Sequence, residues 1–195
     1  MGLQRLSITF YRDPDLVHDI MDFWADFVME TMREAVERAR IDFVTIWEDM
    51  AYRNGPLISP KMFRDFMLPC YKKVTGFIRG KGIDLIMVDT DGNHEALMPL
   101  FLEGGVNCLY PLEVAAGMDA LSLREKYGKR LLLIGNIDKR ALAWGKEAIR
   151  KEVETKIPPL REEGGYIPSI DHAVPSDVPF QNYVYYISLL KKNLD

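Results

Sequence analysis

Short apolar runs recur along the chain, and each is followed by a stretch in which apolar residues have helical spacing. Strands that are apolar on both faces and alternate with helices are typical of parallel βα units. The pattern therefore predicts an α/β fold. The predicted strands cover residues 41–47, 83–88, 106–112, 131–134 and 166–170. The helices that we expect after them cover residues 60–79, 94–104, 118–127, 141–157 and 178–192.

A long helix is predicted before the first strand. Asp13 followed by Pro14 is a typical helix start, because an acid caps the first turn and proline suits the first helical position. Ser59-Pro60 repeats this signal, and Pro69 predicts a kink in the helix that follows.

Length, charge and cysteine content narrow the class of protein. A chain of 195 residues without a linker-like tract predicts one domain, covering residues 1–195. The formal net charge is −4 and no basic stripe occurs, so we expect no nucleic-acid partner. No apolar run approaches the roughly 20 residues of a membrane span, so we expect no membrane partner. Two cysteines cannot form a disulfide scaffold, which favours a reducing, cytoplasmic setting.

Polar residues follow the carboxyl end of each predicted strand. In parallel α/β folds these ends meet at one edge of the sheet, where ligands bind. Each acid taken alone suits a helix N-cap equally well, but the repetition over successive units favours a shared pocket. The candidate residues are Glu48, Asp49, Asp89, Asp91, Asn93, Glu113, Asn136, Asp138, Asp171 and His172.

Such a pocket has defined chemistry. Carboxylates a few ångströms apart raise one another's pKa, so that they can serve as general acid and base or accept hydrogen bonds from ligand N–H groups. Alternatively, Asp89, Asp91 and His172 could bind a divalent metal ion. The sequence leaves both alternatives open. His94 is expected in the first turn of a helix.

Several segments, taken in order, carry a family resemblance. They are Trp47-Glu48-Asp49-Met50-Ala51, Ser59-Pro60-Lys61-Met62-Phe63 with Leu68-Pro69, Asp89-Thr90-Asp91-Gly92-Asn93, Gly135-Asn136-Ile137-Asp138 and the segment from Gly165 to His172. With these segments the chain resembles the uroporphyrinogen decarboxylase superfamily, which includes the corrinoid-dependent and coenzyme M methyltransferases. The resemblance runs from about residue 10 to the end. It implies a (β/α)8 TIM barrel of which this chain supplies about five βα units, a partial barrel with a long amino-terminal helix.

The resemblance also implies roles for single residues. His172 looks like the histidine that lines the substrate cleft of the decarboxylases. Asp49 stands where those enzymes have a serine, after the glutamate matched by Glu48. We expect catalytic roles for His172, Asp91 and Asp49. We expect substrate contacts from Glu48, Asp89, Asn93, Asn136, Asp138 and Asp171.

The chain departs from the family in two places. The zinc-dependent methyltransferases bind their metal through a His-x-Cys-Gly motif and a later cysteine, but here Asp89 and Asp91 stand in the first motif and Asp171-His172 in the later region. Their thiolate zinc site is therefore not expected. The arginine-bearing amino-terminal unit of the decarboxylases has no match in this sequence.

Three functions remain open. The first is a lyase that decarboxylates a tetrapyrrole-related small molecule with positioned carboxylates and a cleft histidine, and that needs no cofactor. The second is a methyltransferase that works with a corrinoid protein and a divalent metal. The third is a truncated, non-catalytic barrel for binding or oligomerisation. Because a partial barrel has two open sheet edges, we expect the amino-terminal helix, a second copy or a missing amino-terminal segment to cover them.

Overall fold

The computed structural model describes residues 1–194 and contains the predicted βα architecture. A five-stranded sheet has the order β1-β4-β5-β6-β7, and the pairings β4–β5, β5–β6 and β6–β7 are parallel. These strands are β1 (Phe43–Trp47), β4 (Leu85–Asp89), β5 (Cys108–Tyr110), β6 (Leu132–Ile137) and β7 (Tyr166–Ile170). The short strands β2 (Ala51–Tyr52) and β3 (Gly55–Pro56) form a separate antiparallel pair, which the apolar pattern did not predict.

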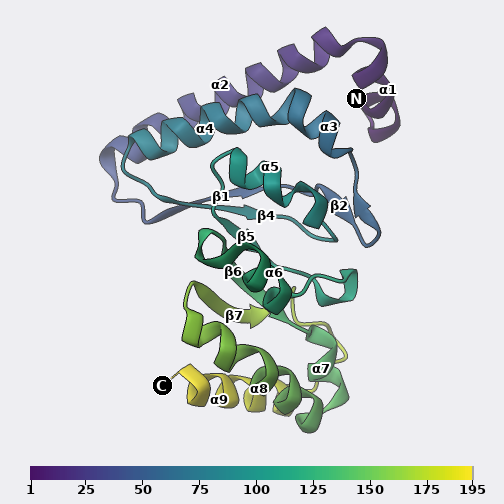
Figure 1. Cartoon of the computed structure of the whole chain (residues 1–195), viewed down its shortest axis with the longest axis vertical. Helices are drawn as coiled ribbons and strands as arrows, with labels where there is room; N and C mark the ends of the chain where they lie inside the picture. Colours follow the sequence, from purple (N-terminus) through teal and green to yellow (C-terminus); the bar gives the residue numbers. More distant parts are fainter. Residues whose placement is uncertain (195) are drawn as a thin grey trace. The chain divides into compact units, whose positions relative to one another are not determined.

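Helices follow the strands of the sheet, as the sequence predicts (Figure 1). The α-helices are α1 (Leu3–Arg12), α2 (Pro14–Arg38), α3 (Pro60–Met62), α4 (Leu68–Gly80), α5 (Met98–Glu103), α6 (Ala120–Tyr127), α7 (Lys139–Trp144), α8 (Lys146–Glu163) and α9 (Phe180–Leu194). A π-helical segment, η1 (Phe63–Met67), joins α3 to α4, and 3-10 turns occupy η2 (Glu95–Leu97), η3 (Val114–Ala116) and η4 (Gly128–Arg130).

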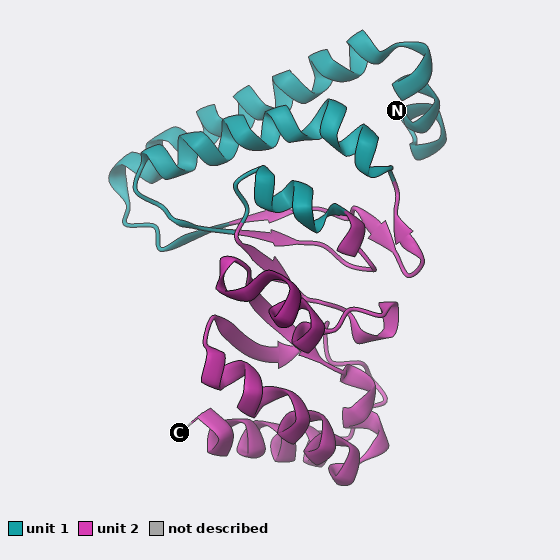
Figure 2. Ribbon diagram, in the orientation of Figure 1, with its two compact units in different colours: residues 1–44, 58–86, 97–106 teal, residues 45–57, 87–96, 107–195 magenta. Residues whose placement is uncertain are grey.

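The chain divides into two compact units (Figure 2). Unit 1 contains residues 1–44, 58–86 and 97–106, and unit 2 contains residues 45–57, 87–96 and 107–195. Strands β1 and β4 each begin in unit 1 and end in unit 2. The expectation of one domain over the whole chain stays a prediction.

Unit 1 is built around helices α2 and α4, which lie along each other (Figure 1). Asp13 accepts a hydrogen bond from the Leu16 N–H at 3.3 Å and caps α2, which confirms the predicted start signal. Ser59 caps α3 in the same way through the Met62 N–H, at 3.2 Å. A π-helical segment precedes Pro69, and the kink predicted at that proline stays a prediction.

Unit 2 is built around α7, α8 and α9. Apolar side chains from these helices and from β6 form a closed cluster in which each is at most 2% exposed. Burying side chains of this size stabilises the unit by about 1.5–3 kcal/mol each. The cluster contains Ile137, Leu142, Ile149, Val153, Ile157 and Tyr186.

The helix predicted over residues 141–157 is wrong in its bounds. Gly145, at φ 115°, separates α7 from α8, and α8 continues through Pro158 and Pro159 to Glu163. Proline has no N–H group, so the carbonyl groups of Glu154 and Thr155, four residues before the two prolines, lose their helical partners. These two residues and both prolines are exposed. Water can therefore satisfy those carbonyls, and the helix passes through the prolines at its surface.

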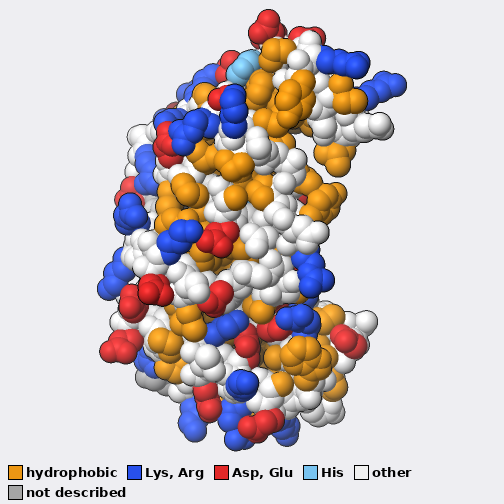
Figure 3. Space-filling view, turned by 45° about the vertical axis from the view of Figure 1, so that its right-hand side comes forward, with side chains coloured by type: hydrophobic (Ala, Val, Ile, Leu, Met, Phe, Trp, Pro, Cys, Tyr) orange, Lys and Arg blue, Asp and Glu red, His pale blue; other side chains and the backbone are white. Residues whose placement is uncertain are grey.

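Large apolar side chains reach the surface at several places (Figure 3). On the edge strand β1, Phe43 is 52% and Trp47 is 80% exposed. On α2, Phe23 is 63% and Trp24 is 53% exposed. Within residues 1–194 no helix combines the length and apolar character that a membrane crossing requires.

Candidate functional site

The predicted polar residues lie at the carboxyl ends of the sheet strands, and all of them belong to unit 2 (Figure 2). The structure separates them into two kinds. Some have side chains that are open to solvent and lie near one another, and others form hydrogen bonds that hold the loops together. The hydrogen bonds of each side chain show to which of the two kinds it belongs.

Four ionisable side chains form the open group: Asp49, Asp89, Asp91 and His172. His172 Nε2 lies 3.4 Å from Asp91 Oδ2, and both side chains are 43% exposed. Burial raises the pKa of Asp89, and the charges of Asp91 and Asp49 raise it further, while His172 acts in the opposite direction. Carboxylates with a raised pKa beside an imidazole can both donate and accept protons. We refer to these four residues as the open group.

The orientation of His172 follows from a local contact. Its Nδ1 accepts a hydrogen bond from the Ala173 N–H at 2.7 Å. In the neutral ring the proton therefore resides on Nε2, the nitrogen that faces Asp91. The imidazole is thus presented to Asp91 as a donor.

Tyr110 ends β5 beside the open group. It pairs with Asp89 in the ladder between β4 and β5. Burial raises the pKa of its phenol, and the charges of Asp89, Asp91 and Asp171 raise it further. A phenol that keeps its proton is a hydrogen-bond donor at an otherwise acidic edge.

Glu113 and Lys139 form an ion pair that binds a neighbouring loop. Lys139 Nζ donates to Glu113 Oε1 at 2.9 Å, and the two side chains are only 21% and 19% exposed. Glu113 Oε2 accepts a hydrogen bond from the Gly92 N–H at 3.0 Å. Burial alone would raise the pKa of Glu113, but the bonds from Lys139 and Gly92 outweigh it and lower the pKa. Glu113 is therefore held as a carboxylate.

Lys139 was not among the residues predicted for the site. It follows Asp138 at the start of a short helix, where lysine is usually solvated and carries no distinctive spacing. Only the tertiary contact with Glu113 sets it apart.

Asp171, predicted to bind substrate, is completely buried. Its Oδ2 accepts a hydrogen bond from the Val114 N–H at 2.8 Å, and its Oδ1 accepts one from the Lys139 N–H at 3.0 Å. Burial raises its pKa, although these two N–H groups act against the shift. Asp171 joins the loops after β5 and β6, so its two carboxylate oxygens serve the fold.

Asn136, for which a substrate contact was predicted, has a structural role. Its side chain is completely buried, accepts a hydrogen bond from the Ala120 N–H at 3.0 Å, and donates to the carbonyl groups of Leu112 and Met118 at 2.8 and 2.9 Å. Both of its amide hydrogens are thus used. This side chain has no donor left for a ligand.

Asp138 fulfils the capping alternative. It accepts a hydrogen bond from the Arg140 N–H at 2.9 Å at the start of α7, and the Arg140 guanidinium binds both of its oxygens at 2.7–3.1 Å. Burial would raise its pKa, but the bonds from Arg140 outweigh it and lower the pKa. Asp138 thus caps α7, and its predicted substrate contact stays a prediction.

Glu48 and Asn93 lie beside the open group. The Glu48 N–H donates to the Asp89 carbonyl at 2.8 Å, which sets its backbone next to β4. The Asn93 side chain donates to the Ala116 carbonyl at 3.0 Å and accepts from the Glu95 N–H at 3.3 Å. Asn93 therefore ties two loops together, and the predicted substrate role of Glu48 stays a prediction.

His94 is completely buried below the same loop. Burial lowers its pKa to about 4, although the Asp91 and Gly92 carbonyls act against the shift. Neither ring nitrogen has a hydrogen-bond partner of good geometry within the described residues. His94 is thus a neutral core residue that lies one position before the turn η2, and not in the first turn of a helix as expected.

The alternative of a metal site finds no geometric support. In the part of the chain that the structure describes, no three His, Cys, Asp or Glu side chains are arranged to hold a metal ion. This applies to Asp89, Asp91 and His172 as well. Metal binding by these three residues stays a prediction.

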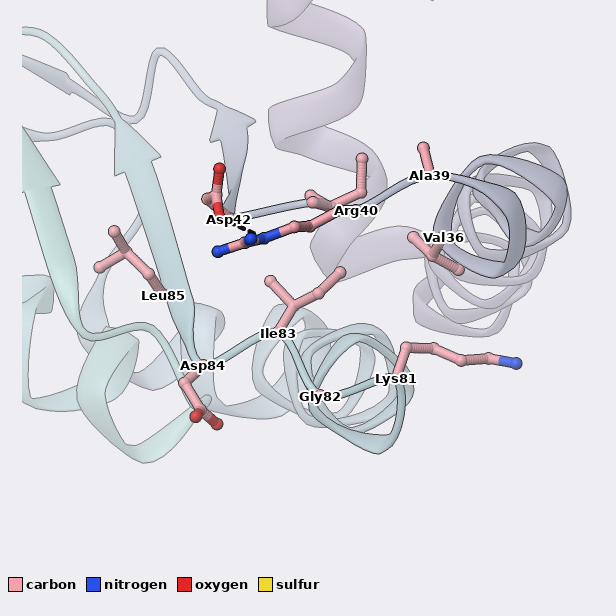
Figure 4. Close-up of a pocket in the computed structure, with 10 residues that line it drawn as sticks. Val36, Ala39, Arg40, Asp42, Lys81, Gly82, Ile83, Asp84 and Leu85 are labelled. Carbon is pink, nitrogen blue, oxygen red and sulfur yellow. Dashed lines mark ion pairs between the residues drawn. The ribbon is translucent and has the colours of Figure 1, made fainter.

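A separate hollow of about 430 Å³ lies in unit 1, before strands β1 and β4 (Figure 4). None of the predicted site residues lines it. Two of its charged residues, Arg40 and Asp42, pair with each other at 3.4 Å and are 92% and 77% exposed. We assign no chemistry to this hollow.

Comparison with known sequences identifies relatives over nearly the whole chain. The model of a family described as "Uroporphyrinogen decarboxylase (URO-D)" matches residues 1–192. A protein named "Uroporphyrinogen decarboxylase" from Photobacterium profundum is 26% identical over an alignment of 188 residues that covers 91% of this chain and 49% of that protein. One of the same name from Serratia proteamaculans is 26% identical over 187 residues. The chain spans about half the length of these relatives.

Comparison with solved structures supports the fold. A "methyltransferase from Methanosarcina mazei" superposes with a TM-score of 0.71 at 18% identity, and the match covers 100% of this chain and 55% of that protein. The α/β fold is therefore confirmed, with this chain corresponding to part of a barrel.

Proposed function

The chain belongs to the uroporphyrinogen decarboxylase family, and from that premise we propose that it decarboxylates a tetrapyrrole-related substrate at the carboxyl ends of β1, β4 and β7. The observation that carries the proposal is the common electrostatic environment of the open group. The names of the curated relatives support the reaction.

The open group suits the nitrogen side of such a substrate. Pyrrole N–H groups are hydrogen-bond donors, and ionised carboxylates are strong acceptors. Asp49 is exposed and Asp89 is partly buried, so both can reach a ligand from the solvent side. We infer that these two carboxylates accept hydrogen bonds from pyrrole N–H groups.

Decarboxylation also requires a proton. The bond between the substrate carbon and its carboxylate breaks, CO₂ leaves, and the electron pair that remains on the carbon takes up one proton. His172 is the donor that we assign to this step. Its imidazolium form gives up the Nε2 proton, the Asp91 carboxylate stabilises that form, and its Nδ1–H then faces solvent instead of the Ala173 N–H.

The acidity of the site limits how the substrate is oriented. Carboxylates of the open group repel the carboxylates of a porphyrinogen at short range. The nearby cations are already paired, since Lys139 contacts Glu113 and Arg140 contacts Asp138. We infer that the pyrrole nitrogens face the open group and that the remaining carboxylate arms of the substrate point away from it.

A direct assay tests the proposal. The full chain is incubated with uroporphyrinogen under anaerobic conditions, and the released CO₂ is measured. His172→Asn and Asp91→Asn should each lower the rate by a factor of about 10² or more, because they remove the proton donor and its partner. Glu95→Gln, which breaks the exposed ion pair with Lys126, is the matched control. A wild-type rate in the His172 variant would contradict the assignment.

Methyl transfer is the second candidate, because a structural neighbour whose match covers the whole chain is named a methyltransferase. In this case the chain would bind a corrinoid instead of a porphyrinogen. Spectrophotometric titration with methylcobalamin distinguishes the two. Corrinoid binding without CO₂ release would favour methyl transfer, and the absence of both would favour a non-catalytic binding module.

A further inference from the structure

We propose that Glu113, Lys139 and Asp171 are positioning residues that hold Asp91 opposite His172; this inference rests on the proposed function only in giving that pair a catalytic role. None of the three is proposed to touch the substrate. Their hydrogen bonds link the loops that follow β4, β5, β6 and β7.

The pair that they serve spans strands that are not neighbours. Asp91 follows β4 and His172 follows β7, and the sheet order places β5 and β6 between these strands. Both residues lie one position beyond the last backbone hydrogen bonds to neighbouring strands, which run from Thr90 N–H to the Tyr110 carbonyl and from Asp171 N–H to the Ile137 carbonyl, each at 2.9 Å. The separation of 3.4 Å between their side chains therefore also depends on contacts among the loops.

Gly92, the residue after Asp91, is held from two sides. Its N–H donates to Glu113 at 3.0 Å. On the other side it lies so close to the hairpin of β2 and β3 that a Cβ atom would come within 2.7 Å of the Ala51 carbonyl carbon. Its φ of 73° favours glycine in any case. The backbone next to Asp91 is therefore fixed in position.

Asp171, the residue before His172, is held by the same set of contacts. Its two oxygens accept the N–H groups of Val114 and Lys139 at 2.8 and 3.0 Å. Val114 follows Glu113 directly, and the Lys139 side chain returns to Glu113 at 2.9 Å. Glu113, Asp171 and Lys139 are therefore linked in a closed ring of contacts, to which Gly92 is attached through Glu113. We refer to this ring as the circuit.

The circuit is buried enough to be maintained in solution. The Glu113 and Lys139 side chains are 19% and 21% exposed and Asp171 is completely buried. Hydrogen bonds to charged groups are stronger when they are shielded from water. By contrast, the Asp91 and His172 side chains are open to solvent, as reacting groups need to be.

Histidine NMR provides the test, because the chain has only three histidines. The protein is labelled with ¹³C-histidine, and His172→Asn identifies the resonances of that ring. Asp91→Asn should shift the His172 resonances, since it removes the facing charge. Glu113→Ala should shift them as well, and Glu113→Gln, which keeps an acceptor for the Gly92 N–H, should shift them less. The His18 resonances should stay unchanged and report that the fold is intact.

Glu95→Ala is the matched control, since it breaks an ion pair of unit 2 outside the circuit. If Glu113→Ala leaves the His172 resonances in place while Asp91→Asn moves them, the positioning role is wrong. If Glu113→Ala does not fold, Glu113→Gln and Lys139→Met decide in the same way. If Asp91→Asn has no effect, the pair is absent in solution and the inference also fails. A protein that shows the expected shifts but releases no CO₂ would keep the positioning role and lose the proposed function.

Discussion

Asp171 accepts hydrogen bonds from two backbone N–H groups, whereas Asp89 lies among other carboxylates at the same edge. Asp171→Asn should lower the free energy of unfolding by about 1–3 kcal/mol, because its amide group would face a buried N–H donor. Asp89→Asn should leave the melting temperature equal or slightly higher, since it removes like-charge repulsion. Thermal unfolding of both variants measures this difference. Equal destabilisation would mean that Asp89 is also a structural residue.

His94 gives the protein a defined response to acid. The pKa of its imidazole is about 4 in the folded state against an ordinary value of 6.5. Between these values the unfolded chain binds a proton that the folded chain does not, so stability falls as the pH is lowered from 6.5 towards 4 and levels off below it. The loss is on the order of 3 kcal/mol.

Urea unfolding at several pH values checks this prediction in the wild type and in His94→Leu. In the variant the free energy of unfolding should decrease less between pH 6.5 and 4, because the titrating imidazole is absent. Identical pH profiles of the two proteins would contradict it.

The sequence predicted which end of the strands carries the polar residues, but it did not separate binding residues from structural ones. Asp91 and Asp171 each lie at such an end, and only three-dimensional contacts show that backbone N–H groups reach Asp171. For the same reason Lys139 was missed, since its partner Glu113 is 26 positions away. The side-chain role depends on loop geometry, which local sequence patterns do not specify.

At the scale of elements, the neighbouring strands β5 and β6 meet closely at Gly135. Its φ is 102°, and a Cβ atom there would lie 2.9 Å from the Pro111 carbonyl carbon and closer still to the Pro111 oxygen. Gly135→Ala should therefore lower the free energy of unfolding by about 3 kcal/mol or more, because the backbone must move to accommodate the methyl group.

Gly117→Ala is the control for this prediction. Gly117 also has a positive φ, 88°, but its Cβ would make only an ordinary contact at 3.6 Å with the Asn93 side chain. Gly117→Ala should lower the free energy of unfolding by about 1 kcal/mol, from backbone strain alone. Chemical denaturation measures the free energy of unfolding of both variants. Similar losses would contradict the prediction that the close approach to Pro111 destabilises Gly135→Ala.

The predicted elements differ from the observed ones where local signals conflict with tertiary packing. The sequence predicted the strands because their runs are apolar on both faces, which is typical of strands in a parallel sheet. The end of α8 was misplaced because Pro158 and Pro159 are strong stop signals, yet their exposed positions let the helix continue. The break at Gly145 was missed because an isolated glycine does not by itself end a helix.

At the scale of the whole molecule, the chain corresponds to about half of its relatives and has two edge strands, β1 and β7. Phe43 and Trp47 of the edge strand β1 are each more than half exposed. Exposed edge strands with large apolar side chains pair readily with other chains. We therefore expect a second copy, or another segment, to cover this edge.

Size-exclusion chromatography with light scattering measures the outcome. The protein should elute with a mass above the 22.4 kDa of one chain, and Trp47→Lys should shift it towards that value. A stable monomer whose β1 amides exchange rapidly with solvent would show that the edge is left open.

The circuit through Glu113, Lys139 and Asp171 has a consequence for how this site can evolve. Because it fixes the loops without using Asp49 or Asp89, these two positions can change in residue type while the framework stays the same. New specificity would then arise by single substitutions at the open positions, whereas insertions in the anchored loops would be selected against. Directed libraries at residues 49 and 89 should thus yield folded variants far more often than libraries at residues 113 and 171.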